Sequence, residues 1–150
     1  MNDNKVIMLS LSDVSMTDDV ILSVNQINTV IGKTPKAAIR TRPAKGGGVW
    51  NYVSGSYMKK RLNMLFGFNW DFEIVSEQIL IDAKEVIVKG KLTCRSAGAT
   101  IVKMQYGNKD IVFRSGTTIP LSIGNDLKAA ATDALKKCAA EIGIAQDQER

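Results

Sequence analysis

Residues 85–94 alternate between two kinds of side chain, and this pattern constrains the fold more than any other feature of the chain. On one side lie Val86, Val88, Leu92 and Cys94, whereas the intervening positions are mainly charged or polar. A period of two residues is the pattern of a β-strand that buries one face and leaves the other in water. We therefore expect a sheet that is covered on one side.

Two further strand candidates flank this segment and make it the centre of a sheet. Trp70–Leu80 precedes it across a polar turn at residues 82–84, and Ala99–Tyr106 follows it across a turn at residues 96–98. Short connections join antiparallel neighbours, so the three segments predict an antiparallel meander. We expect Ile111–Arg114 to extend the same sheet.

Three other segments carry apolar residues at helical spacing, together with residues that start or stop a helix. The first is residues 17–31, before Gly32. The second is residues 54–66, where Ser54 or Ser56 supplies the N-cap and Gly67 ends the helix. The third is residues 125–141, before Gly143. The expected apolar stripe of the last helix consists of Leu127, Ala131, Ala134, Cys138 and Ile142. A meander with helices outside it indicates an α+β fold in which the sheet packs against helices.

A glycine-rich reversal separates two short strand candidates in the first half of the chain. Ala37–Arg42 and Val49–Val53 flank the sequence Pro43-Ala44-Lys45-Gly46-Gly47-Gly48. Successive glycines permit a tight or irregular turn, which predicts a β-hairpin. The sequence leaves two interpretations of the tip open: a plain turn, or a turn whose backbone N–H groups approach phosphates or a neighbouring subunit.

The amino-acid composition excludes several classes of protein. The 150 residues include no histidine, which removes the commonest general base and the commonest nitrogen ligand of zinc. The two cysteines, Cys94 and Cys138, are too few for a closed zinc site; we expect reduced, packed thiols, although the sequence leaves a disulfide open.

No apolar stretch approaches the roughly 20 residues of a membrane span, and the start lacks signal-peptide features. We expect one cytoplasmic domain over residues 1–150, with a lead at residues 1–15 that is mobile or forms an edge strand, and a tail at residues 144–150.

Basic residues are concentrated in one part of the chain. The net charge is +5, and no acidic residue occurs between Asp19 and Asp71. That stretch contains Lys33, Lys36, Arg40, Arg42, Lys45, Lys59, Lys60 and Arg61. Such a run creates a local field that attracts phosphate, so nucleic acid is the leading partner class; the alternative is a solvated basic face without a ligand. Nearby aromatic residues, among them Trp50 and Tyr52, have the chemistry to stack on bases, but we expect most of them in the core.

Carboxylates are the only catalytic candidates that remain. Asp71 followed by Asp82-Ala83-Lys84 superficially resembles the acidic residues and lysine of a metal-dependent nuclease. The spacing is loose, and Asp82 and Lys84 fall in an expected turn, where charged residues ordinarily face solvent. A nuclease is therefore a minor alternative.

Several motifs occur in an order that is similar to one protein family. They are Gly46-Gly47-Gly48, Trp50-Asn51-Tyr52-Val53-Ser54-Gly55, Leu62-Asn63-Met64-Leu65-Phe66-Gly67-Phe68-Asn69-Trp70 and Ala131-Thr132-Asp133-Ala134-Leu135-Lys136-Lys137. Together they resemble the DNA-annealing domain of the Rad52 family, and in particular its phage branch of the Sak type, over about residues 20–145. The sequence departs from the family in three places. One residue is missing between Asn69 and Trp70, Ala140 replaces a customary arginine, and residues 116–120 do not match the lysine-containing loop of eukaryotic members.

The resemblance implies a β-β-α-β-β-β-α annealing domain that assembles into a ring or filament. In this family single-stranded DNA is held by its backbone in a positively charged groove, with the bases exposed for pairing. Basic positions of the family motifs and of the acid-free run together supply the candidate DNA-binding residues. They are Arg40, Arg42, Lys45, Lys59, Lys60, Arg61, Lys128, Lys136 and Lys137.

The implied function is not enzymatic. We expect a homo-oligomer that binds single-stranded DNA and pairs complementary strands without nucleotide hydrolysis, cofactor or essential metal, in phage-type homologous recombination or repair. The expected location is the cytoplasm, which is that of the bacterial host if the protein is phage-encoded. A phage exonuclease or a single-strand-binding protein is a candidate partner, and no membrane contact is expected. Three alternatives stay open: a DNA-end-protecting protein of the same fold, a general RNA-binding module and the metal-dependent nuclease.

Overall fold

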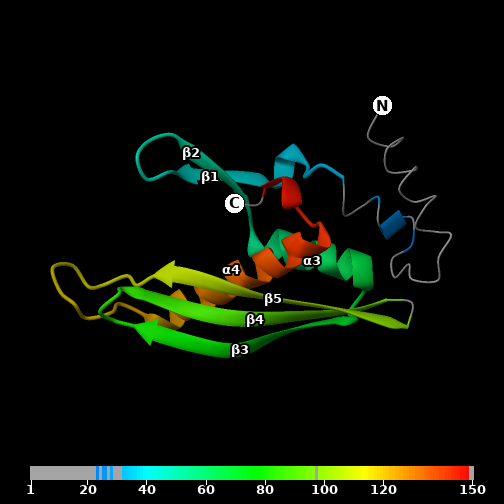
Figure 1. Ribbon diagram of the computed structural model, residues 1–150. Coiled ribbons are helices and arrows are strands. Elements are labelled where there is room, and N and C mark those ends of the chain that lie inside the picture. The colour runs from blue at the N-terminus through cyan, green and yellow to red at the C-terminus, as the bar shows by residue number, and fades with distance from the viewer. Residues whose placement is uncertain (1–22, 24, 27, 29–31, 97, 149–150) are drawn as a thin grey trace.

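The computed structural model of the chain describes residues 23, 25, 26, 28, 32–96 and 98–148 (Figure 1). The expected lead at residues 1–15 lies outside these residues. So does most of the expected helix at residues 17–31, of which Asn25, Gln26 and Asn28 are described and are helical. The described elements follow the order β1-β2-α3-β3-β4-β5-α4, with short 3-10 helices at either end. The predicted α+β fold and its order of elements are confirmed.

Three antiparallel strands form the larger sheet in the order β3-β4-β5: β3 is Trp70–Leu80, β4 is Glu85–Ser96 and β5 is Ala99–Asp110. On β4 the burial alternates as the sequence predicts, because Val86, Val88, Leu92 and Cys94 are all buried. Strand β5 continues four residues beyond the expected end at Tyr106. The meander is therefore confirmed, with one face in the core.

The segment after β5 does not extend the sheet, so that prediction is wrong. Phe113 forms one isolated bridge with Pro120, and together they close a small loop beside the sheet. The physical reason lies in Asp126, a buried residue of the last helix, whose carboxylate accepts the N–H of Val112 at 3.3 Å. The same Asp126 carboxylate lies 3.7 Å from the Lys109 ammonium. It therefore holds this segment against the helix instead of the sheet.

Helix α4, Ile123–Ile142, packs across the buried face of the sheet (Figure 1). It begins after Ser122, whose hydroxyl accepts the N–H of Asn125 at 3.2 Å, and it ends at Gly143, whose φ is 114°. Gly107 on β5 permits the close approach: a Cβ there would lie 2.1 Å from the Ala130 carbonyl oxygen. The backbone of α4 can therefore contact the backbone of β5 only because position 107 has no side chain.

The apolar stripe of α4 differs from the expected one. Ala134 and Cys138 are buried as predicted, but Leu127, Ala131 and Ile142 are half-buried. The remaining buried apolar residues of the helix are Ala130, Leu135, Ala139 and Ala140. The helix is covered on two sides, by the sheet and by α3, so its buried surface is wider than a single stripe.

Helix α3, Gly55–Phe66, lies on α4 and carries Met58, Leu62, Leu65 and Phe66 into the core. The hydroxyl of Ser54 accepts the N–H of Tyr57 at 3.1 Å, which identifies Ser54 as the N-cap and confirms one of the two predicted starts. Gly67 follows the helix with a φ of 63°, a conformation that favours glycine.

The smaller sheet is the hairpin of β1, Ile39–Pro43, and β2, Val49–Val53. The strand predicted from Ala37 begins two residues later, because Lys36–Ala38 forms a short 3-10 helix, η1. At the tip, Gly46, Gly47 and Gly48 all have positive φ values, between 75° and 110°. Three successive residues in this region explain why the turn consists of glycine.

A clamp between distant parts of the chain anchors the base of the hairpin. The Thr34 N–H and hydroxyl both donate to the Asp147 carboxylate, at 3.1 and 2.6 Å. Asp147 belongs to η2, Gln146–Gln148, which follows α4 and contacts β2. In Figure 1 the helices lie between the hairpin and the three-stranded sheet, so the hairpin and the sheet form the outer layers of the molecule.

Candidate nucleic-acid interface

One face of the hairpin combines basic and aromatic side chains. The register pairs Arg40 with Tyr52 and Arg42 with Trp50, and directly opposed residues of an antiparallel pair share a face. The guanidinium carbon of Arg42 lies 5.1 Å from the centroid of the Trp50 ring and 5.7 Å from that of Tyr52. These distances are within the range of cation–π attraction, so Arg42 is held over both rings.

Helix α4 brings a second cation to the same aromatic ring. The Lys136 ammonium lies 5.3 Å from the centroid of Tyr52. Residues 42 and 136 are far apart in sequence, and the fold places both beside one ring. We call Arg42, Trp50, Tyr52 and Lys136 the cation–aromatic cluster. It combines the two kinds of group found in single-strand binding sites: positive charges that bind phosphates and aromatic rings that stack on bases.

The motif around Lys136 sets the rotation of α4. Thr132 faces the start of α3, where a Cβ on Gly55 would lie 2.5 Å from the Thr132 methyl group. Ala134 packs against Gly90 and Gly107 of the sheet, and Leu135 is buried in the core. These three contacts fix the rotation of α4, and in this rotation Lys136 lies beside Tyr52 of the hairpin.

Lys137 faces a different part of the molecule. Its ammonium lies 3.2 Å from the Asp133 carboxylate, which also accepts the N–H of Asn108 on β5 at 3.0 Å. Consecutive helix positions differ by about 100°. The two neighbouring lysines therefore serve two surfaces: Lys136 the hairpin, and Lys137 the edge of the sheet.

The other predicted residues do not join the cluster. Arg40 is exposed on the hairpin, and Lys45 at the tip is 3.4 Å from the Asp110 carboxylate at the end of β5. Lys128 is exposed on α4, two turns before Lys136. Lys59 and Lys60 are exposed on α3, where the half-buried Arg61 lies 5.9 Å from the Tyr57 ring centroid.

Sequence reasoning named Trp50 and Tyr52 among rings able to stack on bases, favoured the core for most of these rings, and missed that these two lie against Arg42. Trp50 is 36% exposed and Tyr52 is half-buried, with both rings against Arg42. A usable signal was present. Arg40 and Arg42 are two residues apart on one strand, as are Trp50 and Tyr52 on the other, so a correctly paired hairpin must place all four on one face.

The nuclease alternative finds no support in the positions of its residues. Asp71 pairs with Arg95 at 2.9 Å at one end of β3, whereas Asp82 lies in the turn beyond the other end. A strand of this length separates them by about 30 Å, at about 3.3 Å per residue. Within the described residues no cluster of three or more acidic or cysteine side chains is arranged to hold a metal ion.

The two cysteines are free and buried, as expected. Burial raises the pKa of the Cys94 thiol to about 11, against a smaller opposing effect of the Arg95 charge. Burial likewise raises the pKa of Cys138. Both groups therefore stay protonated near neutral pH and are poor nucleophiles.

The fold and the cation–aromatic cluster define a protein with a surface suited to a polyanion. The chain belongs to the Rad52/22 family of double-strand break repair proteins, whose family model matches residues 24–146. The resemblance seen in the sequence motifs is thereby confirmed at the level of the family, which places the chain among proteins of DNA recombination and repair. No curated protein matches the chain. None of the described helices is long and apolar enough to cross a membrane.

Proposed function

We propose that this chain is a single-strand annealing protein of the phage Sak-type branch. It binds single-stranded DNA and pairs complementary strands without ATP during recombination or repair. The observation that carries the proposal is the cation–aromatic cluster, in which Arg42 from the hairpin and Lys136 from α4 flank Tyr52. Two separate elements of a domain from a DNA-repair family thus converge on one basic surface.

Phosphate neutralisation gives such a surface its annealing activity. Two single strands repel each other, and cations that neutralise their phosphates lower that repulsion and release bound counterions. Strands held in an ordered row then pair more readily, and duplex formation supplies the driving force. In this proposal Arg42 and Lys136 form the centre of the DNA-binding surface, with Arg40, Lys45, Lys59, Lys60, Arg61, Lys128 and Lys137 around it.

The proposal includes an assembly. Bases are presented in a row only if several subunits bind one strand, so we propose a ring or filament of identical single-domain subunits in the bacterial host cytoplasm. A phage exonuclease that generates the single strand, or a single-strand-binding protein that covers it, is a suitable partner. No step requires a cofactor, a metal or an enzymatic active site.

An annealing assay in EDTA, with fluorescent complementary oligonucleotides and no nucleotide, tests the proposal. We expect the protein to accelerate pairing over the spontaneous rate. A DNA-end-protecting protein would bind without accelerating pairing, an RNA-binding module would prefer an RNA competitor, and a nuclease would be inactive in EDTA but degrade the strands with Mg²⁺. Any of these three results would overturn the proposal.

A matched pair of variants connects the activity to the cluster. Arg42→Ala with Lys136→Ala removes two positive charges from it, whereas Lys33→Ala with Arg114→Ala removes two exposed charges elsewhere. We expect the first pair to lose most of the annealing activity and the second to retain it. Equal losses would mean that net charge alone attracts DNA.

A further inference from the structure

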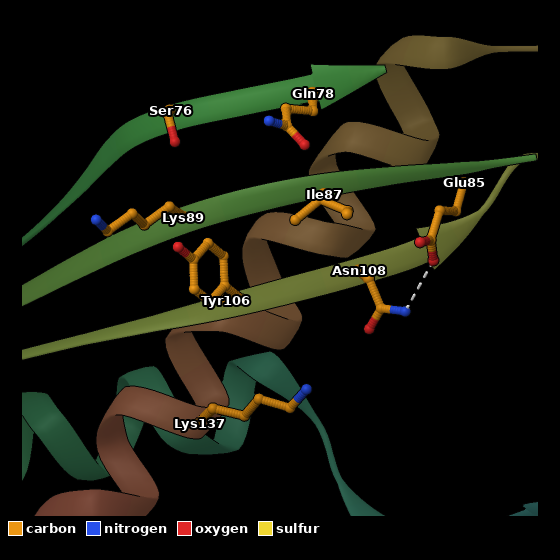
Figure 2. Close-up of a pocket in the computed structure, with 8 residues that line it drawn as sticks. All are labelled: Ser76, Gln78, Glu85, Ile87, Lys89, Tyr106, Asn108 and Lys137. Atoms are coloured by element: carbon orange, nitrogen blue, oxygen red, sulfur yellow. Dashed lines mark hydrogen bonds between the residues drawn. The ribbon is translucent and has the colours of Figure 1, made fainter. Parts of the chain in front are cut away.

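The face of the three-stranded sheet opposite α4 carries a groove, of whose lining the proposed function uses only Lys137. Its volume is about 540 Å³, within the range of ligand sites in proteins. Figure 2 shows side chains from all three strands projecting into it, on the side of the sheet away from α4. We call it the open-face groove. The residues that line it include Tyr106, Lys89, Lys137, Gln78 and Asn108.

An aromatic ring forms one wall of the groove. Tyr106 on β5 is 59% exposed, which leaves much of its ring open to a partner. Lys89 is directly opposite on β4, and its ammonium lies 5.9 Å from the ring centroid. An exposed ring with a cation beside it repeats the chemistry of the cation–aromatic cluster on another surface.

Amide groups form the other end of the groove. Gln78 and Asn108 flank Ile87 from the two neighbouring strands, so their amides lie on either side of one apolar residue. The Asn108 amide nitrogen donates to the Glu85 carboxylate at 3.3 Å (Figure 2). Glu85, the only acidic residue in the lining, is thus engaged at the amide end, away from Lys89. A ring, cations and amides together suit a planar base attached to a phosphate.

Lys137 connects this groove with the hairpin side of the molecule. It lines the groove from α4, while its neighbour Lys136 lies over Tyr52. The pair that Lys137 forms with Asp133 is partly exposed, with 35% and 33% of the two side chains accessible. Such pairs contribute at most about 1 kcal/mol, so a phosphate can compete with Asp133 for this ammonium. Two adjacent lysines therefore provide a basic path around the β5 edge.

We propose that the open-face groove binds one nucleotide of single-stranded DNA, with its base stacked on Tyr106 and its phosphate beside Lys89 and Lys137. The inference rests on the proposed function, because it assigns a second contact to the same strand. Stacking on Tyr106 is lost when the base is absent, so a strand with abasic sites separates this contact from contacts to phosphates.

The test compares Tyr106→Ala with Tyr106→Phe and with Met104→Ala in the full chain. Met104 is exposed on the same strand, two residues away, and does not line the groove. The probes are a labelled thymidine oligonucleotide and a strand of equal length with abasic sites, measured by fluorescence anisotropy. We expect Tyr106→Ala to weaken thymidine binding roughly 5- to 150-fold, the range for one stacked base, and to leave abasic binding unchanged. Tyr106→Phe and Met104→Ala should bind like the wild type.

Two results would overturn the proposal that the open-face groove binds a nucleotide. One is unchanged thymidine binding by Tyr106→Ala while the wild type still binds and anneals, which leaves the proposed function standing. The other is a change of oligomer size in Tyr106→Ala, measured by light scattering, which means that a second copy of the chain covers this face. A wild type that binds no DNA overturns both proposals.

A crosslinking measurement on the wild type needs no variant. A strand with 5-iodouracil, irradiated in complex with the protein, should crosslink to Tyr106 as identified by mass spectrometry. Crosslinks confined to Trp50 and Tyr52 would overturn the open-face site and support the cation–aromatic cluster alone.

Discussion

The two sheets of this protein are both antiparallel, but different contacts stabilise them. In the meander, alternate residues of β4 are buried under α4. In the hairpin, no residue of β1 is buried, and Val53 is the one buried residue of β2. Packing therefore holds the meander, while the hairpin depends on the Thr34–Asp147 clamp and a few contacts with α4 and η2. A sheet that contributes little to the core is free to present cations and aromatic rings on its surface.

Leu92→Ala should have the largest effect on stability, because it removes a fully buried side chain from the meander. A cavity of this kind costs about 2–5 kcal/mol, a large share of the stability of a small domain. Val49→Ala is the matched change in the hairpin, where the side chain is 65% exposed, and we expect it to cost less than about 0.5 kcal/mol. Urea unfolding measures both. Similar losses in the two variants would contradict the difference between the sheets.

Lys136→Ala with Lys137→Ala should abolish most single-strand binding while leaving the fold and the assembly intact. Each lost phosphate contact should also reduce the log–log dependence of affinity on salt by about 0.7. Anisotropy over a salt series and light scattering are the measurements. A collapse to unfolded monomer would mean that these lysines are structural.

The control must remove two positive charges outside the proposed site without disturbing the fold. Lys109 is unsuitable, because its ammonium is 3.7 Å from the buried Asp126 carboxylate and its loss would leave that charge without this partner. Lys33→Ala with Arg114→Ala removes the same charge from exposed positions. An equal loss of affinity in the control would remove the site assignment.

Asp147→Ala should loosen the base of the hairpin and cost about 1–2 kcal/mol, because it removes two hydrogen bonds from Thr34 that contribute about 1 kcal/mol each. Burial raises the pKa of Asp147, but the hydrogen bonds from Thr34 outweigh it and hold the pKa below its usual value. The carboxylate therefore stabilises the fold above the ordinary aspartate pKa of about 3.9, and this contribution disappears as the pH falls through the lowered value. Unfolding curves of wild type and variant should converge only in acid. A difference that stays constant as the pH falls from neutral into the acid range would exclude this origin.

The smallest expected effect is that of pH on DNA binding between about pH 6 and 8. The chain has no histidine, and the two thiols are protonated throughout this range because burial raises their pKa values. Affinity measured at constant ionic strength should stay nearly flat. A sharp transition would show that an unrecognised carboxylate, lysine or thiol titrates at the DNA.

Local patterns were enough to predict most of the elements. Alternation on β4 identified the buried face, and caps such as Ser54 and stops such as Gly67 and Gly143 placed the helices within a few residues. These signals act between residues close in sequence. One error occurred where a residue outside the segment decides, because the segment after β5 follows the buried Asp126 carboxylate. The other is local: Ala37 and Ala38 belong to η1 instead of a strand, and the Ala38 N–H donates to the Pro35 carbonyl.

The sequence by itself determined which residues carry positive charge, most of the strands and helices, and which family the motifs resemble. Only the tertiary structure decided where Lys136 and Lys137 point. Periodicity places both on the polar side of a helix, but the rotation of that helix is set by Gly55, Gly90 and Gly107, which let Thr132 and Ala134 approach closely. These contacts join residues 27 to 77 positions apart in the chain. No local pattern encodes such a distance, so the division of two adjacent lysines between the hairpin and the sheet edge exists only in the folded protein.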